Sequence, residues 1–125
     1  MLKNALCVVM AAFLAMGCAP VQEDLIKGSW KGVAILEDGA PLEVDPTVIN
    51  MSFGDDHSYT YSSTLNYRES GTYYVDSKYL YTTDTLNQAT TEKAVEIVGL
   101  TTDSLILKMN EEGRERLLKM IRAKN

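Results

Sequence analysis

Apolar and polar residues alternate with a period of two along most of the chain from residue 28 onward. Short runs rich in Val, Ile, Thr and Tyr are separated by clusters of Gly, Asp, Asn and Ser. This pattern is typical of consecutive strands joined by tight turns, and it lacks the 3.6-residue period of amphipathic helices. It predicts strands at 29–37, 47–53, 58–66, 71–76, 78–84, 92–99 and 104–110.

The segments between these strands have turn-like compositions. They lie at 38–39, 54–56, 68–70, 76–77, 86–88 and 101–103. None is long enough for the crossover that parallel strands require, so all neighbouring strands are expected to be antiparallel.

The C-terminal segment, NEEGRERLLKMIRAKN, is compatible with a strand or a helix. Its residues have high helix propensity, whereas Glu112-Gly113 resembles a hairpin turn followed by weak alternation. A strand is favoured because seven strands leave an exposed edge, which an eighth removes by closing the meander into a barrel. The expected fold is therefore all-β, an antiparallel up-and-down barrel of about eight strands.

The first residues follow a different pattern. Lys3 precedes an uncharged apolar run at 5–14, and small residues then lead to Cys18. The run is shorter than the roughly 20 apolar residues of a membrane span. A cleaved secretory signal helix at 1–17 is therefore favoured over a buried core helix.

The end of this run, LAMGC, resembles the lipobox of bacterial lipoproteins, although Ala15 stands where that family prefers Leu. The resemblance implies that Cys18 is lipidated on sulfur and becomes the first mature residue. Two or more acyl chains hold a protein stably at a membrane surface. Ala19 stands where Asp would signal inner-membrane retention in enterobacterial lipoproteins, so the resemblance favours the outer membrane of the cell envelope.

Loss of residues 1–17 would change the chemistry of the remaining chain. Cys7 and Cys18 are the only cysteines, so no free thiol is left for a disulfide, a metal or catalysis. The chain has 12 basic and 17 acidic residues, and removal of Lys3 leaves 11 basic residues and a net charge of −6. Such an acidic chain disfavours nucleic acid and anionic lipid as partners.

The remaining residues divide into two parts. Residues 18–27, with Pro20 and two acids, are expected to be the lipidated cysteine and a short solvated tether. Residues 28–125 are long enough for one domain with a modest core, but not for two.

The order of several stretches in this domain resembles the lipocalin and fatty-acid-binding-protein superfamily, and more closely the small lipocalin-like lipoproteins of Bacteroidetes-type bacteria. The matching stretches are Gly28-Ser29-Trp30, MSFGDDHSYTY at 51–61, SGTYYVD at 70–76 and LTTDSLIL at 100–107. In lipocalins the Trp closes one end of the barrel beneath an Arg of the last strand. The resemblance implies this structural role for Trp30 and Arg122, and such a cation–π contact contributes about 0.5–2 kcal/mol.

All seven tyrosines lie between positions 59 and 81, and strand alternation divides them among three neighbouring strands. The predicted groups are Tyr59, Tyr61 and Tyr67 on one face with Leu65, Tyr73 opposite Tyr74, and Tyr79 with Tyr81. Packing within the sheet is one explanation. The alternatives are a small-molecule pocket and a protein interface, for which the candidate contacts are Tyr59, Tyr61, Tyr74, Tyr79 and Tyr81.

Little in the sequence indicates catalysis. His57 is the only histidine and lies in a polar turn beside Asp55 and Asp56, where three adjacent side chains cannot surround a metal ion. The carboxylates are scattered over turns, with no evident buried pair. Since no catalytic or phosphate-binding motif is present either, we expect a protein without enzymatic activity, cofactor or bound metal.

The sequence favours a membrane-anchored, lipocalin-like module that binds a small molecule. The alternative is an interaction or structural protein of the envelope, with a barrel filled by its own side chains and an outer face that binds a protein partner. An eight-stranded barrel is just wide enough for either arrangement. A continuous void of about 300 Å³ or more, open at one end, would favour the ligand pocket.

Overall fold

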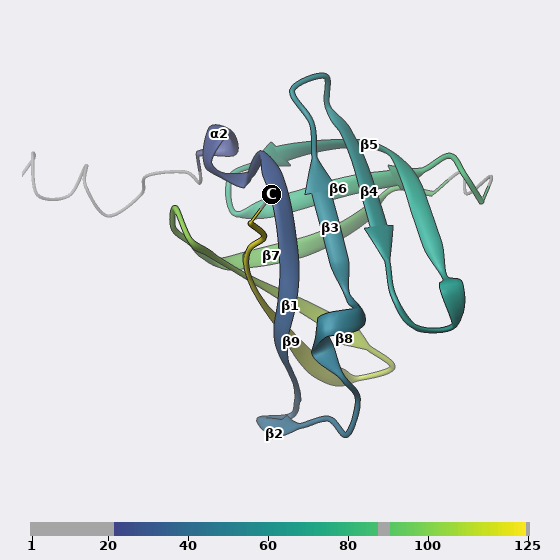
Figure 1. Ribbon diagram of the computed structural model, residues 1–125, viewed down its shortest axis with the longest axis vertical. Helices are drawn as coiled ribbons and strands as arrows, with labels where there is room; N and C mark the ends of the chain where they lie inside the picture. The colour runs from purple at the N-terminus through teal and green to yellow at the C-terminus, as the bar shows by residue number, and fades with distance from the viewer. Residues whose placement is uncertain (1–21, 88–90, 125) are drawn as a thin grey trace, which may run out of the picture.

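Eight antiparallel strands close into a barrel in the computed structural model, which describes residues 22–87 and 91–124 (Figure 1). The all-β, up-and-down architecture predicted from the sequence is confirmed. The barrel strands are β1 (Gly28–Glu37), β3 (Asn50–Phe53), β4 (Ser58–Ser62), β5 (Arg68–Asp76), β6 (Tyr79–Asp84), β7 (Lys93–Leu100), β8 (Ser104–Glu111) and β9 (Arg114–Arg122).

The first strand closes the barrel. The initial residues of β1 pair with β3, and the strand also pairs with β9 from Trp30 to Glu37. The segment after Glu112-Gly113 is therefore the predicted eighth strand and not a helix. Closure leaves no open edge in the barrel, which is the physical reason for preferring a strand there.

Two tight turns at one end of the barrel have the backbone that their sequences predict. Asp38-Gly39 has φ values of 50° and 85°, and Glu112-Gly113 has φ values of 52° and 81°. Positive φ at both central residues matches the twist of the flanking strands, and glycine adopts it at little cost. The first turn leads into β2 (Ala40–Pro41), a short strand that the sequence does not predict.

The strand predicted at 47–53 begins only at Asn50. Pro46–Val48 form instead a short 3₁₀ helix, η1, which Asp45 caps. The Asp45 carboxylate accepts hydrogen bonds from the backbone N–H of Thr47 at 3.0 Å and from its hydroxyl at 2.6 Å. This local capping satisfies the backbone where a strand would need a partner.

The strand predicted at 58–66 is confirmed only as far as Ser62, and the turn predicted at 68–70 is wrong. β4 ends at Ser62, and the chain turns through the 3₁₀ segment η2 (Thr64–Asn66). Leu65 and Asn66 take positive φ values of 59° and 58°. Residues 68–70 consequently belong to β5, which places Glu69 in the barrel wall.

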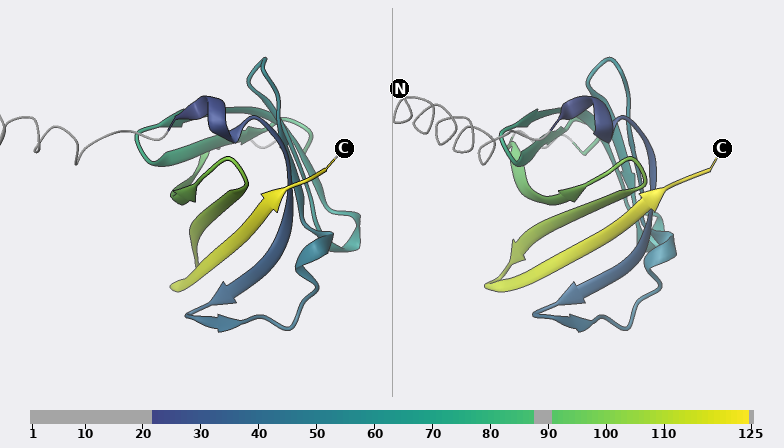
Figure 2. Two further views of the ribbon diagram at one scale, coloured as in Figure 1. Left: turned by 60° about the vertical axis from the view of Figure 1, so that its left-hand side comes forward. Right: turned by 90° about the vertical axis from the view of Figure 1, so that its left-hand side faces the viewer.

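A short helix, α2 (Glu23–Ile26), lies across one end of the barrel, opposite the end that carries β2 (Figure 2). Ile26 is fully buried in the core, and its carbonyl accepts a hydrogen bond of 2.7 Å from the Trp30 indole N–H. The tether expected at 18–27 must therefore end before α2, because Ile26 belongs to the fold.

The predicted signal peptide and Cys18 lie outside the described residues. Within the described part of the chain, no helix is long and apolar enough to cross a membrane.

Candidate functional site

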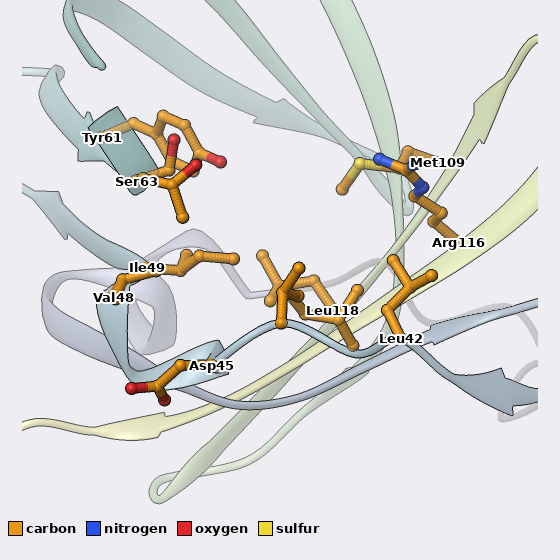
Figure 3. Close-up of a pocket in the computed structure, with 12 residues that line it drawn as sticks. Leu42, Asp45, Val48, Ile49, Tyr61, Ser63, Met109, Arg116 and Leu118 are labelled. Atoms are coloured by element: carbon orange, nitrogen blue, oxygen red, sulfur yellow. The ribbon is translucent and has the colours of Figure 1, made fainter. Parts of the chain in front are cut away.

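The end of the barrel opposite α2 holds two adjoining cavities, with volumes of about 620 and 290 Å³. Four side chains line both of them, namely Tyr61, Ser63, Met109 and Leu118. In Figure 3, which shows the smaller cavity, Tyr61 and Ser63 lie across from Met109 and Arg116. The larger cavity exceeds the roughly 300 Å³ that we set as the size of a ligand pocket.

The larger cavity has an apolar wall and a polar wall. The apolar wall comes mainly from β3, β6, β8 and β9 and comprises Met51, Leu80, Leu107, Met109 and Leu118. The polar wall includes Tyr59 of β4, Tyr67 just before β5, Glu69 of β5 and Lys93 at the start of β7. Further polar side chains, Ser63, Thr82, Asn110 and Glu111, also line this cavity. A pocket that combines apolar surface with polar groups is typical of small-molecule sites.

Glu69 is the centre of the polar wall. Its side chain is only 9% exposed, and its two carboxylate oxygens accept three hydrogen bonds. The Tyr59 hydroxyl donates to Oε1 at 2.9 Å, whereas the Tyr67 hydroxyl and Lys93 Nζ donate to Oε2 at 2.6 and 2.8 Å. These partners explain how a carboxylate remains stable inside the barrel.

The ionisation of this cluster follows from its contacts. Burial raises the pKa of Glu69, but the hydrogen bonds from Lys93, Tyr67 and Tyr59 outweigh burial and lower the pKa below its usual value. The carboxylate is therefore charged at neutral pH. For Tyr67, the hydrogen bond to Glu69 and, to a smaller extent, burial raise the pKa to about 12. Burial, followed by the Glu69 contact, also raises the pKa of Tyr59, so both phenols keep their protons.

The smaller cavity has its own charged group. Arg116 lines this cavity and forms ion pairs with Glu37 at 3.3 Å and with Glu111 at 3.4 Å. Its guanidinium is thus already engaged by two carboxylates. Asp45 is the acidic residue on the opposite side, and its contacts with Thr47 hold its pKa below the usual value.

The structure brings Trp30 and Arg122 together at the closed end. Trp30 is 1% exposed, and the Arg122 guanidinium carbon lies 4.2 Å from its ring centroid. The same guanidinium donates hydrogen bonds of 2.7–2.8 Å to the carbonyls of Leu25, Lys27 and Thr102. This arrangement connects α2 and the β7–β8 turn to the last strand, far from the cavities.

The tyrosines do not form one patch. Tyr59, Tyr61 and Tyr67 line the larger cavity, but Leu65 is exposed in η2 and does not share their face. Tyr73 points inward at the closed end, where its hydroxyl donates to the Gly54 carbonyl at 2.9 Å.

A second group of tyrosines lies on the outside of the barrel, on β5 and β6. Tyr74 and Tyr81 are stacked there with ring centroids 4.8 Å apart, and Tyr79 lies 6.3 Å from Tyr81. These three therefore cannot contact a ligand in the barrel lumen.

The polar turn at 54–57 is a structural element of the closed end. His57 has a φ of 62°, and its ring lies 5.8 Å from that of Tyr73. Its Nε2 atom lies 3.6 Å from the Glu23 carboxylate. Among the described residues, no group of three His, Cys, Asp or Glu side chains could hold a metal ion.

The sequence analysis missed Tyr67, Glu69 and Lys93 as candidate site residues. Counting back in steps of two from the inward Tyr73 leads through position 71 to Glu69 and Tyr67. The same count from the buried Ile97 reaches Lys93. The alternation that identifies these residues is present in the sequence, but the turn predicted at 68–70 interrupts it.

No protein-family model matches the sequence, and no curated protein does. Among solved structures, a lipocalin-like protein from Bacteroides uniformis is similar, with a TM-score of 0.62 and 15% sequence identity. The match covers 79% of this chain and 99% of that one. At this level of identity the similarity concerns the fold, and the chain has a lipocalin-like fold.

Proposed function

We propose that this protein is a binding module without enzymatic activity that holds a small molecule in the open end of its barrel. The observation that carries the proposal is the cavity of about 620 Å³, with one apolar and one polar wall. The lipocalin-like fold supports this use of the lumen, because an eight-stranded barrel can enclose one small ligand.

We also propose that Cys18 is lipidated and anchors the domain in the cell envelope, in the outer membrane. The support is the lipobox-like LAMGC sequence that follows the charged and apolar start of the chain. The C-terminal side of this anchor leads within a few residues to α2, at the closed end of the barrel. The open end with its cavities is the opposite one and would stay accessible to a ligand.

Native mass spectrometry of the protein purified from its own envelope tests luminal binding. We expect a small-molecule adduct on the wild type. Met109→Trp should remove it, because Met109 lines both cavities and a larger ring would fill them. Lys108→Trp is the matched control, since Lys108 is the preceding residue of β8 and points outward to Glu115. An adduct that survives Met109→Trp, or none on the wild type, would contradict luminal binding.

One observation favours the alternative function, an envelope protein that binds a partner through its outer face. Tyr74, Tyr79 and Tyr81 form an aromatic cluster on the outside of β5 and β6, and Tyr74 is 43% exposed. Tyrosine is enriched at protein interfaces. A co-purifying protein in the same experiment, lost on Tyr74→Ser but not on Met109→Trp, would support this alternative.

A further inference from the structure

The larger cavity contains a fixed anion and a movable cation. Glu69 lies within β5, is 9% exposed, and is held by the Tyr59 and Tyr67 hydroxyls as well as by Lys93. Lys93 is the first residue of β7, and its side chain is 55% exposed. A lysine ammonium on a flexible stem can return to water easily, whereas the buried carboxylate cannot follow it.

The polar wall is rich in hydrogen-bond acceptors. The Tyr59 and Tyr67 hydroxyl protons are used on Glu69, so both phenol oxygens can only accept a further hydrogen bond. Glu69 itself is an acceptor, because the contacts that lower its pKa keep it ionised. A ligand that binds this wall must therefore bring donors.

The charges around the lumen also favour a cation. Glu69 and a single base, Lys93, line the larger cavity together with Glu111, whose charge is balanced by Arg116. In the described part of the chain, Arg116 is the other base that lines either cavity, and it is already paired with Glu37 and Glu111. An anionic ligand would have to approach Lys93 within reach of the Glu69 carboxylate, which costs repulsion in a partly buried site.

We infer that the lumen takes a small amphipathic ligand with a protonated amine, whose ammonium replaces that of Lys93 on the Glu69 carboxylate. This inference rests on the proposed luminal binding. The ammonium of the ligand supplies up to three donors to Glu69 and the two phenol oxygens. Its apolar body lies against the apolar wall, which includes Leu80, Leu107 and Leu118. Lys93 acts as an internal competitor that occupies the carboxylate when no ligand is bound.

Isothermal titration calorimetry with three probes of equal chain length tests the inference: octylamine, octanoate and octanol, at pH 7 and low salt. In the wild type we expect octylamine to bind more tightly than octanoate. Lys93→Met should raise the affinity for octylamine roughly tenfold, because the carboxylate loses its competitor. Lys78→Met is the matched control: it removes one positive charge at the β5–β6 turn, next to Tyr79, and should change nothing.

Glu69→Gln removes the negative charge and should abolish the preference for octylamine over octanol. Near-UV circular dichroism shows whether this variant keeps its tertiary structure. If Glu69→Gln does not fold, the Lys93→Met variant still tests the inference. Lys93 is half exposed, so its replacement does not remove core packing.

The three probes separate the inference from the proposed function. Octanol binding with no gain for octylamine in Lys93→Met would overturn the amine inference and leave luminal binding intact. The same holds if octanoate binds the wild type best and loses affinity in Lys93→Met, since Lys93 would then be an anion site. Failure of all three probes to bind any variant would overturn luminal binding, and the amine inference with it.

Discussion

Arg122 covers the indole of Trp30 at the closed end of the barrel, with 4.2 Å between the guanidinium carbon and the ring centroid. The two residues also pair directly in the β1–β9 ladder. Trp30 meets α2 through its hydrogen bond to the Ile26 carbonyl, and Arg122 does so through the carbonyls of Leu25 and Lys27. The Trp30–Arg122 pair therefore links α2 to the last strand, β9, at the closed end of the barrel.

Replacement of Trp30 by Ala should strongly destabilise the protein. Trp30 is among the largest fully buried side chains, and loss of such a side chain typically costs about 3–5 kcal/mol. For a domain of this size, that corresponds to a fall in Tm of more than about 10 °C. Thermal unfolding followed by circular dichroism measures this. Val33→Ala, an exposed position of the same strand, is the control and should have a small effect. Equal Tm values for Trp30→Ala and wild type would contradict the role of Trp30 in the core.

Arg122→Lys should destabilise the barrel although it keeps the positive charge. The guanidinium donates to three separate carbonyls, of Leu25, Lys27 and Thr102, and a single ammonium cannot reach all of them. Carbonyls left without their donor should cost about 2 kcal/mol in the free energy of unfolding. Urea denaturation provides the measurement, with the exposed Arg114→Lys of the same strand as control. If both variants are equally stable, the hydrogen-bond geometry of Arg122 does not matter.

Glu69 should make the stability of the protein depend on pH in the acidic range. Its pKa is lowered in the folded state, so its contribution is fully present above the ordinary Glu pKa and is lost as pH falls through the lowered folded value. We expect the free energies of unfolding of wild type and Glu69→Gln to differ at neutral pH and to converge in acid. Urea denaturation at a series of pH values measures the difference, which cancels contributions from other carboxylates such as Asp84. A difference that is independent of pH would show that Glu69 is not held ionised by its partners.

The mature N-terminus should begin at Cys18 and carry acyl chains. Intact-mass measurement of the membrane-purified protein should show loss of residues 1–17 and addition of lipid. Cys18→Ala should abolish both changes, because the sulfur is the attachment point that the lipobox resemblance implies. Cys7→Ala lies in the segment expected to be removed, so it should give the wild-type mass. Unmodified mass in the wild type would contradict the lipid anchor.

The course of the chain could be predicted because alternation is a local signal. Side chains on a strand point alternately to two faces, so a barrel with one buried face leaves a period-two pattern in the sequence. The turn at Asp38-Gly39 was predictable for a similar reason, since its backbone needs residues that tolerate positive φ. The break at Leu65 was not, because Leu rarely takes positive φ and the surrounding letters continue the alternation.

Prediction of the candidate site depended on where the strand before Leu65 ends. With 68–70 assigned to a turn, Glu69 was counted among the scattered surface carboxylates. The structure continues β5 through these residues and turns Glu69 inward, where Tyr59 reaches it from the neighbouring strand β4 and Lys93 from β7, on the far side of β6. Similarly, alternation separated Tyr73 from Tyr74 correctly, but it did not show which face of each strand is the lumen.

The order of the barrel strands and their antiparallel connections could be predicted from the sequence, because both depend on neighbours along the chain. The lipid on Cys18 stays a prediction from the same kind of local pattern. The three-dimensional fold was needed to show that Ile26 belongs to the core, that the tyrosines form an inner and an outer group, and that Glu69 and Lys93 meet beside a cavity. These relationships join residues far apart in sequence. They arise from how the barrel closes and which face it turns inward, and no local pattern encodes that closure.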